Sequence, residues 1–103
     1  MNNSFSAWSH RLRASDATAC TELFHTLHTP LIYYAQQLLG HEQTACDVVQ
    51  EAFIKLWEHR KTLDPEQSLK AYIYTIVRNT AFNHMSMIRR EQKYRSDEAL
   101  PDT

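Results

Sequence analysis

Two stretches decide the fold of this chain: CDVVQEAFIKLWEHR at residues 46–60 and SLKAYIYTIVRNTAFNHMSMIRR at residues 68–90. In both, apolar residues recur every three or four positions, which is the spacing of one face of an α-helix. The first stretch predicts a helix over about 42–59, with an apolar stripe made of Ala45, Val49, Ala52, Phe53, Leu56 and Trp57. The second predicts a helix that begins at residue 66 or 68 and ends near residue 93.

The sequence before these stretches predicts more helix. A short helix is expected over about 4–13, and a second helical pattern continues to residue 38. Ser15 is the expected N-cap of that second helix, with Asp16 in its first turn, where a negative charge suits the helix dipole. Pro30 should kink this helix or split it in two, because proline lacks the backbone N–H that a helix needs. Gly40 should end it.

The connection between the two long helices is RKTLDPEQ, at residues 60–67. Here Asp64 is the expected N-cap of the last helix, and Pro65 suits the first helical position. Gln67 stands where a capping box takes an amide. The connection therefore looks like an ordinary capped turn.

Composition agrees with an all-α fold, a compact bundle of three to four main helices joined by short connections. The chain has 103 residues, one Gly, three Pro and 43% hydrophobic residues, which is typical of a single folded domain with few chain breakers. No apolar run is long enough to span a bilayer, and the N-terminus lacks a signal-peptide pattern. We therefore expect a cytoplasmic protein without membrane insertion.

The helix expected over about 42–59 has a second face that the apolar stripe leaves free. Asp47, Glu51, Ile54 and Glu58 are spaced four, three and four apart, so they share one line, and Gln50 borders them. One interpretation is a solvated charged face with a single exposed Ile. The other is a docking surface, in which Ile54 is the apolar centre and the carboxylates receive Arg or Lys from a partner.

The last helix also presents two chemistries. Its inward positions are expected to be Leu69, Ile73, Ile76, Val77, Thr80 and Ile88. Tyr72, Asn79, Asn83, Ser86 and Arg90 fall close to another line. Tyr can stack on an exposed base, Asn can bond to its edge, and the basic residues Arg78, Arg89, Arg90 and Lys93 can contact phosphates. The alternative is that the Tyr belongs to the core and the amides are simply solvated.

The sequence offers little for catalysis or for a cofactor. It has no glycine-rich phosphate loop and no recognisable nucleophile–base arrangement. The two cysteines, Cys20 and Cys46, are expected to be free buried thiols rather than a disulfide. The six histidines are scattered, so we expect no metal site.

The pair of helices resembles conserved region two of bacterial sigma factors, especially those of the small extracytoplasmic-function (ECF) group. The segment DVVQEAFIKLW, followed about thirty residues later by the R-N-x-A-x-N pattern of the last helix, carries the resemblance. The upstream SDATACTELF also fits the family pattern G-D-x-x-A-F-x-x-L-Y, with Ser15 in place of the usual Gly.

The resemblance implies a transcription initiation factor with two binding surfaces. The acidic helix would dock on the clamp helices of the largest subunit of the RNA polymerase core through Asp47, Gln50, Glu51, Ile54 and Glu58. The last helix and the loop before it would recognise and melt the minus-ten promoter element by capturing a flipped base of the non-template strand. The DNA-binding residues would be Leu63, Asp64, Pro65, Glu66, Gln67, Ser68, Tyr72, Asn79, Asn83, Arg89 and Arg90.

The loop is where the sequence departs from the family pattern. The usual Phe-x-Gly entry, and the Phe and Trp on the helix, are replaced by Leu63, Asp64-Pro65, Leu69 and Tyr72. Because the pocket residues differ, the base preference of the family does not carry over.

By the same resemblance, residues 1–93 form the helical domain and residues 94–103 the disordered start of an interdomain linker. The chain is then expected to be the first domain of a factor that also carries a helix-turn-helix domain for the minus-thirty-five element. An anti-sigma factor is a further expected partner. The alternative is a helical protein-interaction domain that has this fold but does not bind DNA.

Overall fold

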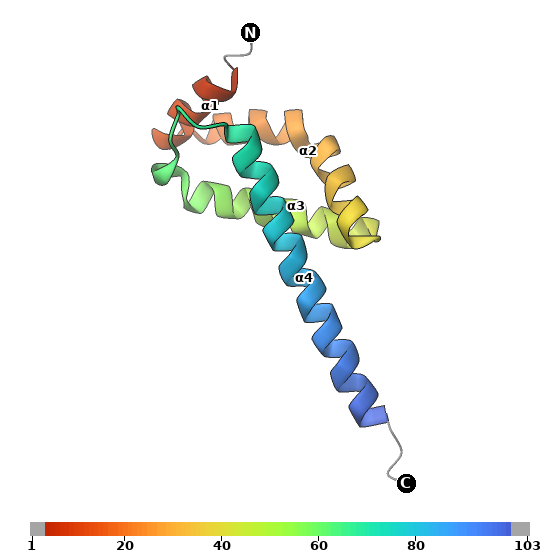
Figure 1. Cartoon of the computed structure of the whole chain (residues 1–103). Helices are drawn as coiled ribbons and strands as arrows, with labels where there is room; N and C mark the ends of the chain where they lie inside the picture. Colours follow the sequence, from red (N-terminus) through yellow and green to blue (C-terminus); the bar gives the residue numbers. More distant parts are fainter. Residues whose placement is uncertain (1–3, 100–103) are drawn as a thin grey trace.

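The computed structural model describes residues 4–99, which form four α-helices and one short 3-10 helix (Figure 1). The elements are α1 (Ser4–Arg13), α2 (Ala17–Leu39), α3 (Glu42–Glu58), η1 (Arg60–Thr62) and α4 (Leu69–Ala99). Within this range there is no β-strand. The all-α fold that the sequence predicts is therefore confirmed, and α1 and α3 have nearly the bounds expected of them.

The start of α2 differs from the sequence prediction. Its N-cap is Asp16 and not Ser15: the Asp16 side chain accepts a hydrogen bond from the backbone N–H of Thr18, at 3.0 Å. Ser15 instead has a positive φ of 64°, in the left-handed region that makes a tight turn between α1 and α2. Asp is as good an N-cap as Ser. Because Ser15 and Asp16 are adjacent, the sequence alone does not decide which of the two begins α2.

Pro30 does not divide α2, which continues as one helix from residue 17 to residue 39. Figure 1 shows that the helix changes direction midway, where orange gives way to yellow. The sequence predicts that Pro30 either kinks the helix or splits it, and the structure shows a kinked, continuous helix. At the end of α2, Gly40 adopts a left-handed conformation with φ of 81°, and its N–H donates to the carbonyl of Gln36 at 2.8 Å. The predicted glycine stop is thus confirmed.

The core lies where α3 is held between α2 and α4. Five of the six predicted stripe residues of α3 are buried, and Trp57 is half-buried. Val48, which the predicted stripe omits, is also fully buried. Since α3 packs against helices on two sides, its buried face is wider than a single stripe. Phe24 of α2 meets Phe53 of α3 edge to face, with ring centroids 5.0 Å apart.

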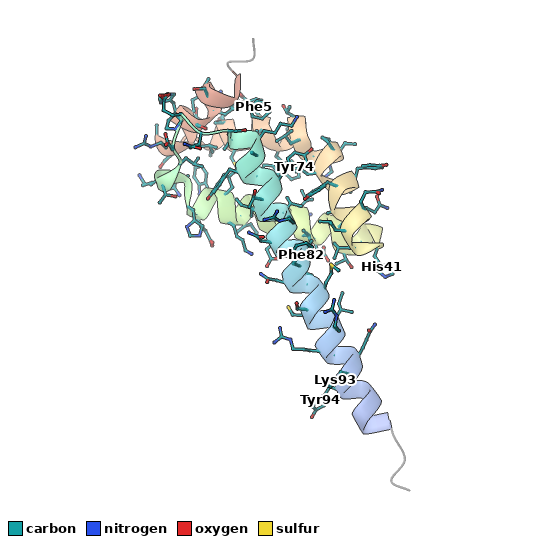
Figure 2. The ribbon with its side chains drawn as sticks, in the orientation of Figure 1. Phe5, His41, Tyr74, Phe82, Lys93 and Tyr94 are labelled. Carbon is teal, nitrogen blue, oxygen red and sulfur yellow. The ribbon has the colours of Figure 1, made fainter. Side chains whose placement is uncertain are left out.

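The first half of α4 belongs to this core, and the second half leaves it. Leu69, Ile73, Val77 and Thr80 are buried, as predicted. Ile88, also expected in the core, is 37% exposed, because α4 projects past the other helices from about this point (Figure 1). The helix continues to Ala99, beyond its expected end near residue 93, and Lys93 and Tyr94 lie on the projecting part (Figure 2).

Two groups of side-chain contacts stabilise the connections at the α1 end of the bundle, one between α1 and α2 and one between α3 and η1. Arg11 pairs with both Asp16 and Glu22 at 2.8 Å, and the indole N–H of Trp8 donates to Glu22 at 3.0 Å. The hydrogen bonds from Arg11 and Trp8 lower the pKa of Glu22 to about 2. Nearby, the guanidinium of Arg60 in η1 stacks on the ring of Trp57, 4.1 Å from its centroid.

Candidate functional site

The connection between η1 and α4 forms a cavity rather than a plain capped turn. Asp64, the expected N-cap of the last helix, caps a local turn instead: its Oδ1 accepts from the N–H of Glu66 at 2.9 Å. The helix begins five residues later, at Leu69, and Ser68 acts as its cap by accepting from the N–H of Ala71 at 3.1 Å. The chain between the two caps is free to curve around a hollow.

This hollow, the loop cavity, has a volume of about 170 Å³. Four of the six loop residues predicted to contact DNA line it, and so does Tyr72. Pro65 and Glu66 lie in the loop but do not line the cavity. The complete lining is Ser9, Thr62, Leu63, Asp64, Gln67, Ser68, Leu69 and Tyr72. The structure therefore brings four of the six loop residues and Tyr72 together around one cavity.

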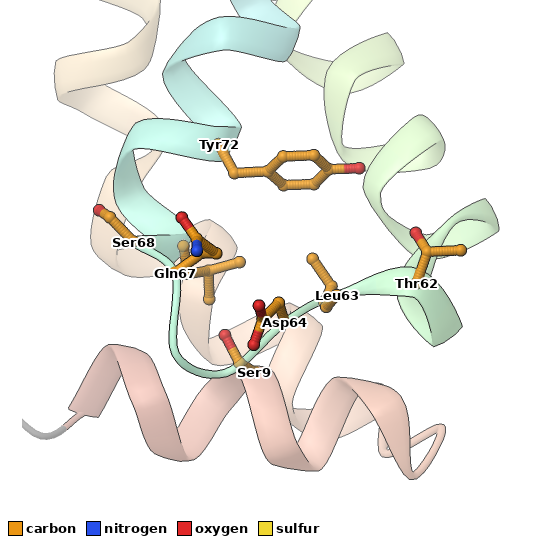
Figure 3. A pocket seen from close by; sticks show the side chains of 8 residues that line it. Ser9, Thr62, Leu63, Asp64, Gln67, Ser68 and Tyr72 are labelled. Carbon is orange, nitrogen blue, oxygen red and sulfur yellow. The ribbon is translucent and has the colours of Figure 1, made fainter.

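The walls of the loop cavity come from three parts of the chain (Figure 3). The Tyr72 ring of α4 lies on the side opposite Ser9 of α1, with Leu63, Asp64 and Gln67 of the loop between them. Leu63 and Leu69 are buried and anchor the loop to the core. Ser9 is only 1% exposed, and sequence analysis missed it. No pattern could have pointed to it, because a small polar residue on the inner face of a short helix has no distinctive spacing.

A second hollow, of about 330 Å³, adjoins the first along α4. It shares Gln67, Ser68 and Tyr72 with the loop cavity and adds Ala71 and Thr75. Tyr72 is half-buried, so its ring is fixed by the core and still borders both hollows. The two interpretations of this residue, core or base platform, are compatible in the structure.

The remaining DNA-binding candidates lie farther along α4. Asn79, Asn83 and Arg90 are all exposed and fall within about 20° of the line through Tyr72, at ~100° per residue. Asn83, Ser86, Arg89, Arg90 and Lys93 together border a broad surface hollow of about 530 Å³. Arg90 is eighteen residues beyond Tyr72, a distance of about 27 Å along the helix. The candidate residues thus form two groups, one at each end of the line.

The predicted outer face of α3 is present, with one difference. Asp47, Gln50 and Glu58 are exposed, and Ile54 is 58% exposed although its chemistry favours burial. Glu51, expected to be exposed, is half-buried instead, because its Oε2 lies 2.9 Å from Nε2 of His84 on α4. A hydrogen bond of 3.2 Å from Lys55 to the hydroxyl of Thr80 joins the same two helices. We call the set of Asp47, Gln50, Glu51, Ile54 and Glu58 the α3 face.

Other site types find no support in the described part of the chain. No His, Cys, Asp and Glu side chains of residues 4–99 are grouped in threes that could hold a metal ion. Cys20 and Cys46 are free thiols, as expected, although each is half-buried rather than buried, and burial raises the pKa of the Cys20 thiol. None of the described helices combines the length and apolarity needed to cross a bilayer.

Comparison with known proteins identifies the class to which this arrangement belongs. The family described as sigma-70 region 2 matches residues 23–94, and the chain belongs to that family. Proteins of this family are transcription initiation factors and not enzymes. The match covers α2 from its second turn, all of α3, and α4 as far as Tyr94.

The curated relatives of the chain include a factor described as belonging to the extracytoplasmic-function (ECF) group. The chain is 29% identical over 84 residues to the ECF RNA polymerase sigma factor SigL of Mycobacterium tuberculosis, which covers 81% of this chain and 45% of SigL. It is 31% identical over 81 residues to the RNA polymerase sigma factor SigZ of Bacillus subtilis, covering 79% of this chain and 43% of SigZ. The chain thus spans less than half the length of either relative.

A solved structure shares the fold. An engineered region 2 of sigmaE, determined by NMR in a complex with GTAAAA, superimposes with a TM-score of 0.78 over 88% of this chain and 93% of that one. The two sequences are 23% identical. The bundle of α1 to α4 is therefore that of sigma region 2, as the resemblance implied.

Proposed function

We propose that this domain docks on the clamp helices of the RNA polymerase core and recognises and melts the minus-ten promoter element. In this proposal the loop cavity captures a base that has flipped out of the non-template strand. The observation that carries the proposal is the cavity itself, which brings loop residues together with the Tyr72 ring at the start of the exposed line on α4. A bound hexanucleotide in the structurally similar sigmaE domain supports a nucleic-acid role.

The loop cavity suits a planar ring. Its volume of about 170 Å³ compares with the roughly 150 Å³ of an engineered protein cavity that holds benzene. Extracting a base costs a few kcal/mol in lost stacking and pairing. Stacking on an aromatic side chain returns about 1–3 kcal/mol, and hydrogen bonds to the base edge add to that. Tyr72 supplies the ring, Ser9 supplies a hydroxyl on the opposite side, and Asp64 and Gln67 supply polar atoms between them.

The length of α4 limits which phosphates its basic residues Arg89, Arg90 and Lys93 can contact. A stacked strand advances about 3.4 Å per nucleotide, so the 27 Å between Tyr72 and Arg90 corresponds to about eight stacked nucleotides. Arg89, Arg90 and Lys93 are therefore too far away to hold the phosphate of the flipped base. They would contact the backbone of a more distant part of the promoter, while Asn79 and Asn83 lie beside the strand between the two groups.

The α3 face is the proposed docking surface for the clamp helices. Ile54, with 58% of its surface exposed, offers an apolar centre, and the carboxylates around it favour a partner that presents Arg or Lys. An anti-sigma factor that covers this face or the α4 line would block either contact. This surface lies on α3, and the loop cavity opens at the start of α4, so both partners can bind one domain.

The proposal is tested by selecting binders from a random pool of single-stranded DNA, using the 103-residue chain with a clamp-helix fragment present. Sequence-specific enrichment is expected, and a double substitution Asn79→Ala, Asn83→Ala should abolish it. The matched control is Gln37→Ala, Gln43→Ala, which removes two exposed amides from α2 and α3. If the wild-type chain enriches no sequence and the Asn double substitution changes nothing, the promoter-recognition role is excluded, and the chain is instead a helical protein-interaction domain.

A further inference from the structure

Among residues 4–99, which the structure describes, Asp64 is the only charged residue that lines the loop cavity. Its position is fixed by the turn, because Oδ1 accepts from the N–H of Glu66 at 2.9 Å. Oδ2 is the second acceptor of the same carboxylate. Figure 3 shows the Asp64 carboxylate between Ser9 and Leu63 at the border of the cavity. A group that enters the cavity therefore meets an oriented negative charge.

The other polar groups of the lining are chemically ambivalent. Gln67 can present either its N–H₂ or its carbonyl, and the hydroxyls of Ser9, Thr62 and Ser68 can each donate or accept a hydrogen bond. Such groups adapt to any base edge. A carboxylate cannot adapt in this way, because it only accepts hydrogen bonds. The selectivity of the cavity should therefore come from Asp64.

We propose that Asp64 makes the loop cavity selective for a base that carries an exocyclic amino group, and that it rejects thymine. This inference rests on the proposed function. Cytosine, adenine and guanine each offer an amino N–H₂ to an acceptor, and carboxylates accept from cytosine N4 in known complexes. Thymine lacks an amino group, and its single ring N–H is flanked by two carbonyl oxygens. Placing these oxygens against the carboxylate sets acceptor against acceptor.

The test is the same random-pool selection, read at the nucleotide position where the composition depends on residue 64. The wild-type chain should deplete thymine at that position by about fivefold, the lower end of the range for a good bidentate base contact, because Oδ1 of Asp64 is already used in the turn. Asp64→Asn should reverse the preference. An Asn can keep its Oδ1 in the turn with Glu66, so its N–H₂ replaces Oδ2 and donates to a thymine oxygen.

Two further variants keep the result interpretable. Asp64→Ser retains a turn-capping oxygen and presents a hydroxyl that can donate or accept. This variant should therefore neither deplete nor enrich thymine. Glu91→Gln is the control: it removes the same charge from an exposed position on α4, outside the cavity lining, and should leave the preference unchanged. Circular dichroism of each variant should show the helix content of the wild type.

The outcomes separate the two proposals. Specific enrichment in which thymine is as frequent as the other bases, or in which Asp64→Asn leaves the composition unaltered, would overturn the role of Asp64 and retain the proposed function. A loss of thymine depletion in Glu91→Gln would show that net charge, and not the Asp64 contact, sets the preference. Absence of any enrichment, with no effect of the Asn79, Asn83 double substitution, would remove the DNA-binding function and this inference with it.

Discussion

The Nε2 atom of His84 lies 2.9 Å from the Oε2 atom of Glu51, which ties the α3 face to α4 at the position directly after Asn83. The His84 side chain is 29% exposed and that of Glu51 is 44% exposed, so water reaches the pair. A contact of this kind contributes about 0.2–1 kcal/mol. It joins the two surfaces that we propose for polymerase and for DNA.

We predict that the Glu51–His84 contact can be measured as a coupling free energy. His84→Ala and Glu51→Ala should each lower the free energy of unfolding slightly, and the double variant should lose less than their sum, by about 0.2–1 kcal/mol. Urea unfolding of the four proteins gives this number. His84→Ala should also leave binding of the clamp-helix fragment intact, because it frees a carboxylate of the α3 face. Weaker fragment binding in His84→Ala would assign the histidine to the docking surface.

Ile54 and Leu56 should separate binding from folding, although they are two residues apart on α3. Leu56 is fully buried, so Leu56→Ala should cost about 2–5 kcal/mol of stability. Ile54→Ala removes an exposed side chain and should change stability by no more than about 0.5 kcal/mol. Only the Ile54 variant should remain folded and bind the clamp-helix fragment more weakly. Equal fragment affinity in wild type and Ile54→Ala would argue for a merely solvated face.

The Arg11 cluster should make stability sensitive to acid. The pKa of Glu22 falls from 4.5 to about 2 in the folded protein, chiefly through its hydrogen bond with Arg11. A depressed carboxyl pKa stabilises the fold above the unfolded value of 4.5, and this contribution is lost as the pH drops from 4.5 to about 2. Urea midpoints measured across this window should fall less steeply for Glu22→Gln than for the wild type. Parallel curves would mean that the ion pair does not persist in solution.

The salt dependence of DNA binding should reveal whether the basic residues Arg89, Arg90 and Lys93 of α4 contact phosphates. If three or four phosphates are contacted, the log–log slope for a single strand is about −2 to −3. Arg90→Ala should make the slope less steep by roughly 0.7, the share of one phosphate. Lys61→Ala, on η1 and distant in sequence from the group, is a control that should leave it unchanged. Fluorescence anisotropy at several salt concentrations provides the measurement.

The helical part of the fold follows from the sequence because its causes are local. The spacing of apolar residues predicts both ends of α3 to within about one residue, and Gly40 predicts the end of α2. Both predictions succeed because helical periodicity and the glycine stop act within one or two turns. The sequence predicts Ser15 as the N-cap of α2, whereas the cap is Asp16. Both residue types are good N-caps, and only the tight turn at Ser15 decides between them. The exposure of Ile88 depends on where the neighbouring helices end, which spacing within α4 does not encode.

The candidate site was foreseen in part for the same reason. The line from Tyr72 through Asn79 and Asn83 follows from helix periodicity alone. The loop cavity does not, because its shape depends on Asp64 capping a turn rather than the helix, and on Ser9 arriving from α1. The half-burial of Glu51 likewise depends on His84, which is 33 residues away in the chain.

The contribution of α1 to the loop cavity bears on how the working unit of this family should be delimited. The family match begins at residue 23, whereas Ser9 closes one side of the cavity and Leu12 is fully buried in the core. A fragment cut at the start of the match would keep α3 and the two asparagines of α4, but it would lack Ser9, which lines the cavity beneath the loop. A fragment that keeps the complete lining of the cavity therefore begins upstream of the family match, within α1.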